Sequence, residues 1–256
     1  MIHLLKNSWE KDRKIIMPII IIALAVVLKF SSIAGGKLKD YYFYFYEGMD
    51  LFEPEGSQIF ELPYLWFLLH SYILFIVGRD CTDQLDVLET KLLLEKGKLK
   101  FQIMKFIFLL FKGAFSLILF LIFIFFFKET VGRFIPGIEG LVYFSEEYFP
   151  LQLYDEQVLY VTVIRDFFGI LIFSAIEQIL AYFVDNRISF LIVNLIMIIG
   201  IFTGIPTLLI NGMMVRRYLV SMDWYFYVLV LLVLILGAFF IFYLKEKRKD
   251  YIGVFR

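Results

Sequence analysis

The sequence has almost none of the residues that build disulfide bonds or metal sites. Its 256 residues include one cysteine, Cys81, and two histidines, His3 and His70. One cysteine excludes a disulfide within the chain, and two histidines alone do not make a dedicated zinc site. A Walker A motif is also missing, because residues 95–98 (EKGK) lack its first glycine and the Ser or Thr after the lysine. The sequence therefore indicates neither redox nor metal chemistry, nor ATP binding through a P-loop.

Charge is scarce and apolar residues are abundant. Charged residues make up 20% of the chain, hydrophobic residues 61% and aromatic residues 20%, with a mean hydropathy of +0.81. A soluble domain is about 45 to 50% apolar, and a transmembrane helix needs roughly 20 apolar residues. We therefore expect a single all-α transmembrane domain over residues 1–256 with six transmembrane helices. The six apolar runs cover residues 15–34, 62–78, 104–127, 158–184, 188–210 and 224–244.

The N-terminal residues 1–14 carry Trp9 and four cationic side chains directly before the first apolar run. This pattern is typical of an interfacial helix on the inner leaflet. The first run continues past the length of a signal peptide, so we expect a retained span. Pro18 lies in its first turn, where a missing N–H is tolerated, and supports a helix start there.

The net charge is zero, but its distribution predicts a topology. With both termini in the cytoplasm, the inner segments hold 17 Lys and Arg against 10 Asp and Glu, and the outer segments hold 7 against 13. Lys and Arg concentrate on the cytoplasmic side of membrane proteins. We expect a multi-pass plasma-membrane protein with both termini cytoplasmic. The inner segments are residues 1–14, 79–112, 185–187 and 245–256, and the outer ones 29–61, 128–156 and 211–223.

Residues 79–105 form the one long, highly charged segment between two apolar runs, and they predict an amphipathic helix with a basic exit. Leucines spaced i, i+3 and i+7 share one face, and acidic residues fall mostly away from it. Gly97 is a natural residue for leaving the helix. The apolar face suits docking to a soluble partner; alternatively, it lies on the inner leaflet or under the spans. The candidate contact residues are Asp83, Leu85, Asp86, Leu88, Glu89 and Leu92.

The fourth apolar run contains the pairs Arg165-Asp166 and Glu177-Gln178, although a charge at the bilayer centre costs about 2.5 to 3.5 kcal/mol on insertion scales. Arg165 and Asp166 are merely interfacial if the span is residues 167–184. Glu177 either extends inward to the cytosol or lines a cavity between spans. Gln178 can bridge to a neighbouring helix.

The fifth run should be broken in its outer half. Gly200, Gly204 and Pro206 precede Asn211-Gly212 there, and such residues kink or end a helix. The Gly-xxx-Gly spacing also permits close helix contact or dimerisation. The candidate cavity or interface residues of the last runs are Glu177, Gln178, Asn194, Gly200 and Gly204.

The outer segments combine aromatic and acidic residues. In residues 35–61 these fit an aromatic belt at the bilayer boundary or a surface that contacts a cationic amphipathic substrate. Arg216 and Arg217 lie on this side against the positive-inside trend, and they could pair with the acidic outer loops. They are therefore candidates for outer polar contacts.

Catalysis is not expected. The spans offer no nucleophile with a base and no three-ligand metal set, and only the fourth run has several of the polar groups that a channel needs. A transporter subunit or a nonenzymatic membrane scaffold remains, and nothing points to a nucleic-acid partner.

The layout resembles the permeases of type 2 ABC exporters. Residues 78–80 (GRD) and 98–100 (KLK) flank the segment that is similar to the family's coupling helix, and residues 1–14 are similar to its elbow helix. Residues 61–66 (ELPYLW) and 211–216 (NGMMVR) look most like small permeases of peptide and bacteriocin export or immunity systems. The short segment between the fifth and sixth runs departs from larger members.

This resemblance implies a permease subunit without a cofactor of its own. Two copies of a separate ABC ATPase, carrying ATP and Mg, would dock on the coupling helices of two permeases, identical or different. An amphipathic or hydrophobic peptide, or a lipid-like molecule, would be exported at the permease interface. The alternative is a nonenzymatic immunity or sensor protein that binds a peptide or lipid without transporting it.

Overall fold

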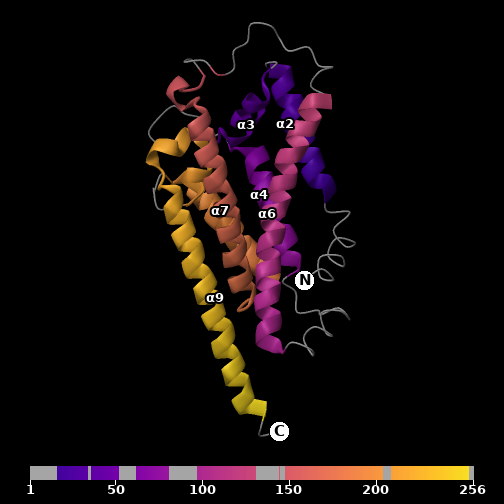
Figure 1. Ribbon diagram of the computed structural model, residues 1–256, viewed down its shortest axis with the longest axis vertical. Coiled ribbons are helices and arrows are strands. Elements are labelled where there is room, and N and C mark those ends of the chain that lie inside the picture. Colours follow the sequence, from indigo (N-terminus) through magenta and orange to yellow (C-terminus); the bar gives the residue numbers. More distant parts are fainter. Residues whose placement is uncertain are drawn as a thin grey trace.

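The protein is an all-α bundle in which one helix, α7, contacts most of the others (Figure 1). The computed structural model describes residues 16–33, 36–51, 62–80, 97–130, 144, 148–203 and 209–253, and these residues contain no β-strand. The all-α prediction is confirmed for this part of the chain.

Four helices are long and apolar enough to cross a membrane. They are α2 (Ile16–Ile33), α6 (Lys98–Thr130), α7 (Glu156–Ala181) and α9 (Trp224–Gly253). The apolar part of α9 ends at Leu244. Many large apolar side chains on them point away from the protein, including Leu229, Leu236 and Phe240 of α9. This supports the predicted membrane class.

Two further apolar helices, α4 (Tyr64–Asp80) and α8 (Asn186–Phe202), have 17 residues each. At 1.5 Å per residue they are about 26 Å long, slightly less than a ~30 Å hydrocarbon core. Six helices of full spanning length were expected, and the described residues provide four. α8 is short because it ends at Phe202, which confirms the predicted break in the fifth run.

Short polar signals set the helix boundaries. Asp155 accepts a hydrogen bond from the Gln157 backbone and caps the start of α7, and Asp185 does the same for α8. Gly97 has a φ of +77°, a conformation that glycine adopts without strain, and α6 begins at the next residue. Gly97 itself is therefore not helical; the helix predicted to end there lies mostly outside the described residues.

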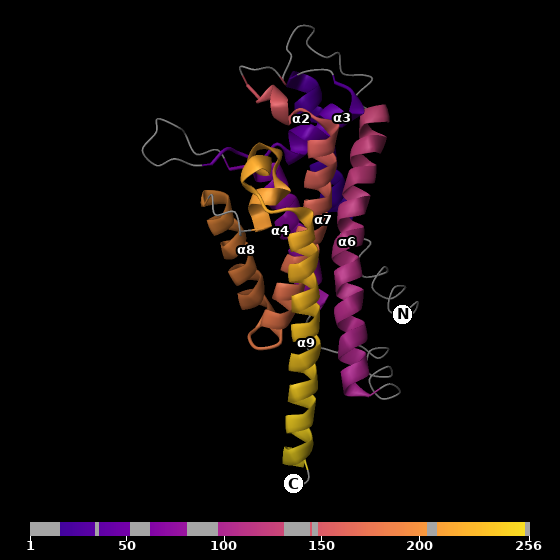
Figure 2. The ribbon, with the colours of Figure 1, turned by 60° about the vertical axis from the view of Figure 1, so that its left-hand side comes forward.

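The helices run in alternating directions (Figures 1 and 2). We call the end where α4 and α9 finish and α6 starts the basal end, and the end where α2 and α6 finish and α7 starts the apical end. The short turn from α7 to α8 points toward the basal end, although in Figure 2 it lies above the start of α6 and the end of α9. Residues 81–96 are therefore flanked by helix ends that lie on the same side as the end of α9.

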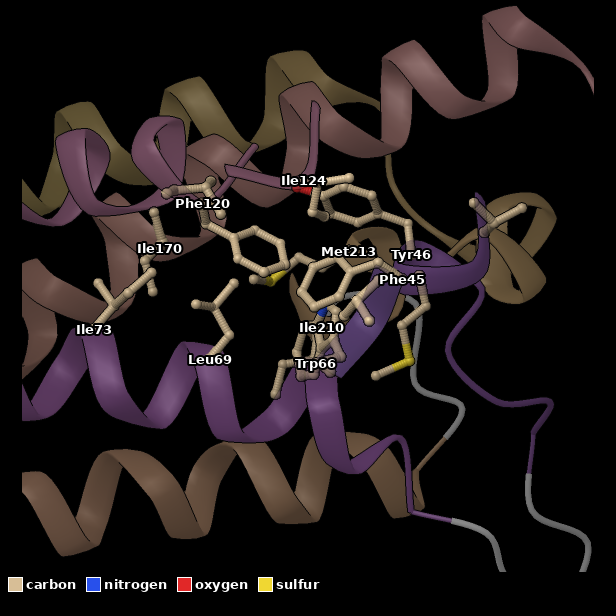
Figure 3. Packing of buried hydrophobic residues seen from close by; sticks show 14 of the residues in the cluster. Phe45, Tyr46, Trp66, Leu69, Ile73, Phe120, Ile124, Ile170, Ile210 and Met213 are labelled. Carbon is tan, nitrogen blue, oxygen red and sulfur yellow. The ribbon is translucent and has the colours of Figure 1, made fainter. Parts of the chain in front are cut away.

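The short helix α3 (Leu38–Tyr46) packs between α2, α4, α6 and α7. Tyr41, Phe43, Phe45 and Tyr46 are at most 3% exposed, and Figure 3 shows the last two beside Trp66 and Phe120. These four rings are therefore neither an aromatic belt nor an outward surface. The hydroxyl group of Tyr41 is not left without a partner, because it forms a hydrogen bond with Ser31 Oγ of α2 at 2.7 Å.

The apical and lateral connections form 3₁₀ turns: η2 (Leu151–Leu153), η3 (Leu209–Met213) and η4 (Val215–Val220). Before η2, Phe144 and Phe149 pack against Phe43 of α3. A folded outer segment was expected here, and Phe144, Phe149 and Leu153 of it are part of the core.

The amphipathic helix predicted for residues 79–105 is partly corrected. Its first two residues belong to α4, and its last eight, from Lys98 to Lys105, belong to α6. Residues 81–96 and 1–15 lie outside the described residues.

Candidate functional site

A histidine and an aspartate meet in the middle of the bundle. His70 of α4 and Asp166 of α7 are both fully buried, and His70 Nε2 lies 2.7 Å from Asp166 Oδ1. The other ring nitrogen of His70, Nδ1, lies 2.7 Å from the Trp66 carbonyl oxygen, and the Trp66 ring stacks on the imidazole at 4.0 Å. Two helices thereby fix the imidazole in position and orientation.

The hydrogen bonds define the proton content of this pair. A carbonyl oxygen only accepts, so His70 Nδ1 must carry a proton and donate it to Trp66. The contact between Nε2 and Asp166 needs a second proton, on either the ring or the carboxyl group. The pair is electrically neutral in both arrangements, which suits its dry surroundings.

Tyr46 of α3 completes this centre. Its hydroxyl group donates to Asp166 Oδ2 at 3.1 Å, so both carboxylate oxygens have a partner. Burial, together with the charge of Asp166, holds the pKa of Tyr46 well above its ordinary value. The hydroxyl group therefore remains a donor at any physiological pH.

Arg165 and Asp166 lie within α7 and inside the protein, whereas one interpretation of the sequence placed them before a span of residues 167–184. α7 already begins at Glu156, and the two side chains are 3% and 0% exposed. Arg165 donates from Nη1 to Ser221 Oγ at 2.7 Å and lies over the Tyr218 ring. Protein groups from other parts of the chain replace water around both charges.

Arg217 of η4 uses all five of its N–H donors inside the protein. It is 1% exposed, and Asn211 Oδ1 accepts from it at 2.6 Å. Two more acceptors, the Gly200 and Ile201 carbonyl oxygens, belong to the last turn of α8, and the other two are those of Met49 and Asp50. A cation here satisfies carbonyl groups that α8 leaves open at its C-terminus. Burial lowers the pKa of Arg217 to about 10, so it remains charged at neutral pH.

Arg216 pairs with the acidic residues after α3, as the sequence suggested. It donates to Glu47 at 2.9 and 2.5 Å, to Asp50 at 2.6 Å and to the Tyr148 carbonyl oxygen at 2.6 Å. Burial lowers the pKa of Arg216, but the carboxylates of Glu47 and Asp50 outweigh burial and raise it overall. Arg216 and Arg217 thus join η4 to the segment after α3.

Asn194 and Gly200 both contact other parts of the same chain. Asn194 Oδ1 accepts from Ser71 Oγ of α4 at 2.5 Å. A Cβ atom at Gly200 would lie 2.7 Å from Ile210 of η3. Gly200 therefore packs against its own chain and does not present an open surface for dimerisation; Gly204 lies outside the described residues.

Glu177 is buried, and no hydrogen-bond partner for it occurs in the described part of the chain. Its side chain is 0% exposed, which excludes the inward extension to the cytosol that the sequence left open. Both its oxygens, Ser174 Oγ and Gln178 Nε2 lack hydrogen-bond partners among the described residues. Towards the middle of the bundle, Trp66 Nε1 and Arg165 Nε are also buried without a hydrogen-bond partner among the described residues. The predicted bridge from Gln178 to another helix is thus not made by that nitrogen.

The candidate partner-contact residues are not brought to this centre. Asp83, Leu85, Asp86, Leu88, Glu89 and Leu92 lie outside the described residues. No group of three or more potential metal ligands occurs in the described part of the chain.

Sequence analysis missed the partnership of His70, Asp166 and Tyr46. His70 was considered only as a zinc ligand, and Tyr46 only as part of an aromatic belt or of an outward surface for a cationic substrate. A usable signal existed, because an ionisable residue inside an apolar run needs a partner in another run. His70 and Asp166 are two such residues.

Comparison with known proteins gives no relative. No protein-family model, no curated protein and no solved structure matches the chain.

Proposed function

We propose that this chain is the permease subunit of an ATP-driven ABC exporter in the plasma membrane. α4 and α8 complete six membrane crossings, and both termini are cytoplasmic. The cargo is an amphipathic or hydrophobic peptide or a lipid-like molecule. A separate ATPase, present in two copies, supplies the energy with its own ATP and Mg.

One observation carries this proposal. The helices that flank residues 81–96 end and begin at the basal end, where α9 also ends (Figures 1 and 2). α4 and α6 contact each other directly, and both contact α7. A soluble partner that pushes on residues 81–96 would therefore move two connected helices and, through them, α7.

The packed interior favours a pathway outside the single chain. α3 fills the space between four helices with aromatic rings (Figure 3). In the proposal, cargo moves along an interface between two permeases, identical or different, with Gly200 excluded from that interface by its contact with Ile210.

The experiment introduces an aspartate on the apolar face of residues 81–96. Leu88→Asp and Leu92→Asp are expected to abolish copurification of the coexpressed ATPase and its substrate-stimulated ATP hydrolysis, with membrane insertion intact. Thr90→Asp adds the same charge about half a helical turn from Leu88 and should leave both unchanged. If all three variants retain the ATPase, the docking claim is wrong.

The same packed interior also favours a second candidate, a nonenzymatic immunity or sensor protein that binds a peptide or lipid. Such a protein has no need for a moving pathway. It would protect or signal without any ATPase, so peptide binding that persists in Leu88→Asp and requires no ATP hydrolysis supports this candidate.

A further inference from the structure

Three neighbouring side chains on α7 expose unpartnered polar atoms to the protein interior. Ser174 and Glu177 are 0% exposed and Gln178 is 7% exposed. Their spacing of i, i+3 and i+4 places them on one face of the helix. The four unpartnered atoms are Ser174 Oγ, Glu177 Oε1, Glu177 Oε2 and Gln178 Nε2.

Two glycines on the facing helices make room for these side chains. A Cβ atom at Gly78 of α4 would lie 2.2 Å from Glu177 Oε1. A Cβ atom at Gly113 of α6 would lie 2.9 Å from Ser174 Oγ and 3.7 Å from Val77. Ser174 and Glu177 therefore occupy a recess at the junction of α4, α6 and α7, and any larger residue at Gly78 would displace the carboxylate.

The recess needs a positive charge. An ionised carboxylate is strongly disfavoured in an apolar interior unless a cation or hydrogen-bond donors compensate it. Glu177 has no ion-pair partner among the described residues, and the nearest cationic side chains in sequence on the facing helices, Arg79 and Lys112, each have interactions of their own. Glu177 Oε1 already fills the place of a Gly78 methyl group, so the occupant must be small.

We propose that Glu177, Ser174 and Gln178 form a buried binding site for a small monovalent cation, a proton or Na⁺. Carboxylate, hydroxyl and amide oxygens are hard ligands that suit Na⁺, and the amide of Gln178 can present its oxygen by rotating. A proton would instead bond to one carboxylate oxygen of Glu177. This site does not depend on the proposed export function.

Thermal unfolding of the purified protein in detergent tests the Na⁺ form. At pH 9, with choline replacing Na⁺ to keep the ionic strength constant, Na⁺ at about 100 times its Kd should raise Tm by about 5 to 10 °C. Glu177→Gln and Gly78→Ala should abolish this response. Gly237→Ala is the matched control, because a Cβ atom at that position meets nothing within 4 Å, and it should respond like the wild type.

Infrared spectroscopy tests the proton form in the same samples. In Na⁺-free buffer at neutral pH, the wild type and Gly237→Ala should show the C=O band of a protonated carboxyl group that Glu177→Gln lacks. A Na⁺-dependent Tm identifies Na⁺ as the occupant. A carboxyl band that disappears in Glu177→Gln, without a Na⁺-dependent Tm, identifies the proton.

The wild type by itself can overturn the proposal, even if every variant fails to fold. A protein whose Tm ignores Na⁺ and whose spectrum contains no protonated carboxyl band has no cation at Glu177. Folded Glu177→Gln with the same Na⁺ response and the same band as the wild type overturns it too.

Discussion

Asp166 and Glu177 lie three turns apart on α7, about 16 Å along its axis, and both face α4. Opposite Asp166, α4 presents His70 at 2.7 Å; opposite Glu177, it presents Gly78, which offers no side chain. One carboxylate has partners for both oxygens, and the other has none. The same pair of helices therefore contains a closed polar contact and an open one.

The difference between the paired Asp166 and the unpaired Glu177 suggests two roles: the first stabilises helix packing, and the second is available to a ligand. A closed contact such as His70 with Asp166 specifies how α4 and α7 pack, because any shift leaves buried charge unpaired. An open contact adds nothing to packing until a ligand arrives. We expect substitutions in closed contacts to reduce stability and substitutions at Glu177 to change ligand response.

The largest effect is expected for the most completely paired residue. Arg217→Ala should lower the free energy of unfolding by about 3 to 5 kcal/mol, because four carbonyl groups and Asn211 lose their donor. Chemical unfolding in detergent measures it. Arg187→Ala, at an exposed position, should change stability by less than about 0.5 kcal/mol. If both substitutions lower the free energy of unfolding equally, the buried hydrogen bonds of Arg217 do not stabilise the fold.

Breaking the central pair should cost somewhat less. His70→Leu and Asp166→Leu are each expected to lower the free energy of unfolding by about 3 kcal/mol. The double variant should lose less than the sum, with a coupling free energy of about 1 to 3 kcal/mol in a double-mutant cycle. Additive losses would mean that the contact at 2.7 Å carries no specific energy.

A methyl group at Gly78 tests whether Glu177 occupies the space next to this glycine. Gly78→Ala should lower stability by about 1 to 3 kcal/mol, because the new methyl group overlaps Glu177 Oε1. Gly237→Ala should remain within about 0.5 kcal/mol of the wild type. If Gly78→Ala is equally neutral, Glu177 does not occupy the recess.

The smallest effect is a pH dependence of the closed contact. The pKa of Tyr46 is raised in the folded protein, so its contribution is complete below about pH 10 and is lost as the pH rises above that value. The stability advantage of the wild type over Tyr46→Phe should fall by about 1.4 kcal/mol per pH unit above pH 10. Unfolding curves between pH 8 and 11 measure this, and a constant difference would contradict the burial of the hydroxyl group.

The sequence predicted local features well and contacts between distant segments poorly. Hydropathy located α7 to within three residues, and Gly200 with Pro206 located the end of α8. The partner of Arg216 followed from its charge opposite an acidic segment. Hydropathy contains no information on which helices touch, so the His70–Asp166 contact was missed. The spacing of Gly200 and Gly204 left close helix contact and dimerisation open, and Gly200 contacts Ile210 of its own chain.

The pairing of α4 with α7 also constrains the synthesis of this protein. His70 leaves the ribosome 96 residues before Asp166, and Glu47 precedes Arg216 by 169 residues. At 5 to 20 residues per second, His70 waits roughly 5 to 20 s for its partner. During this interval His70 lacks the carboxylate partner that it has in the folded protein, although contacts within the first half of the chain, such as Ser31 with Tyr41, can already form.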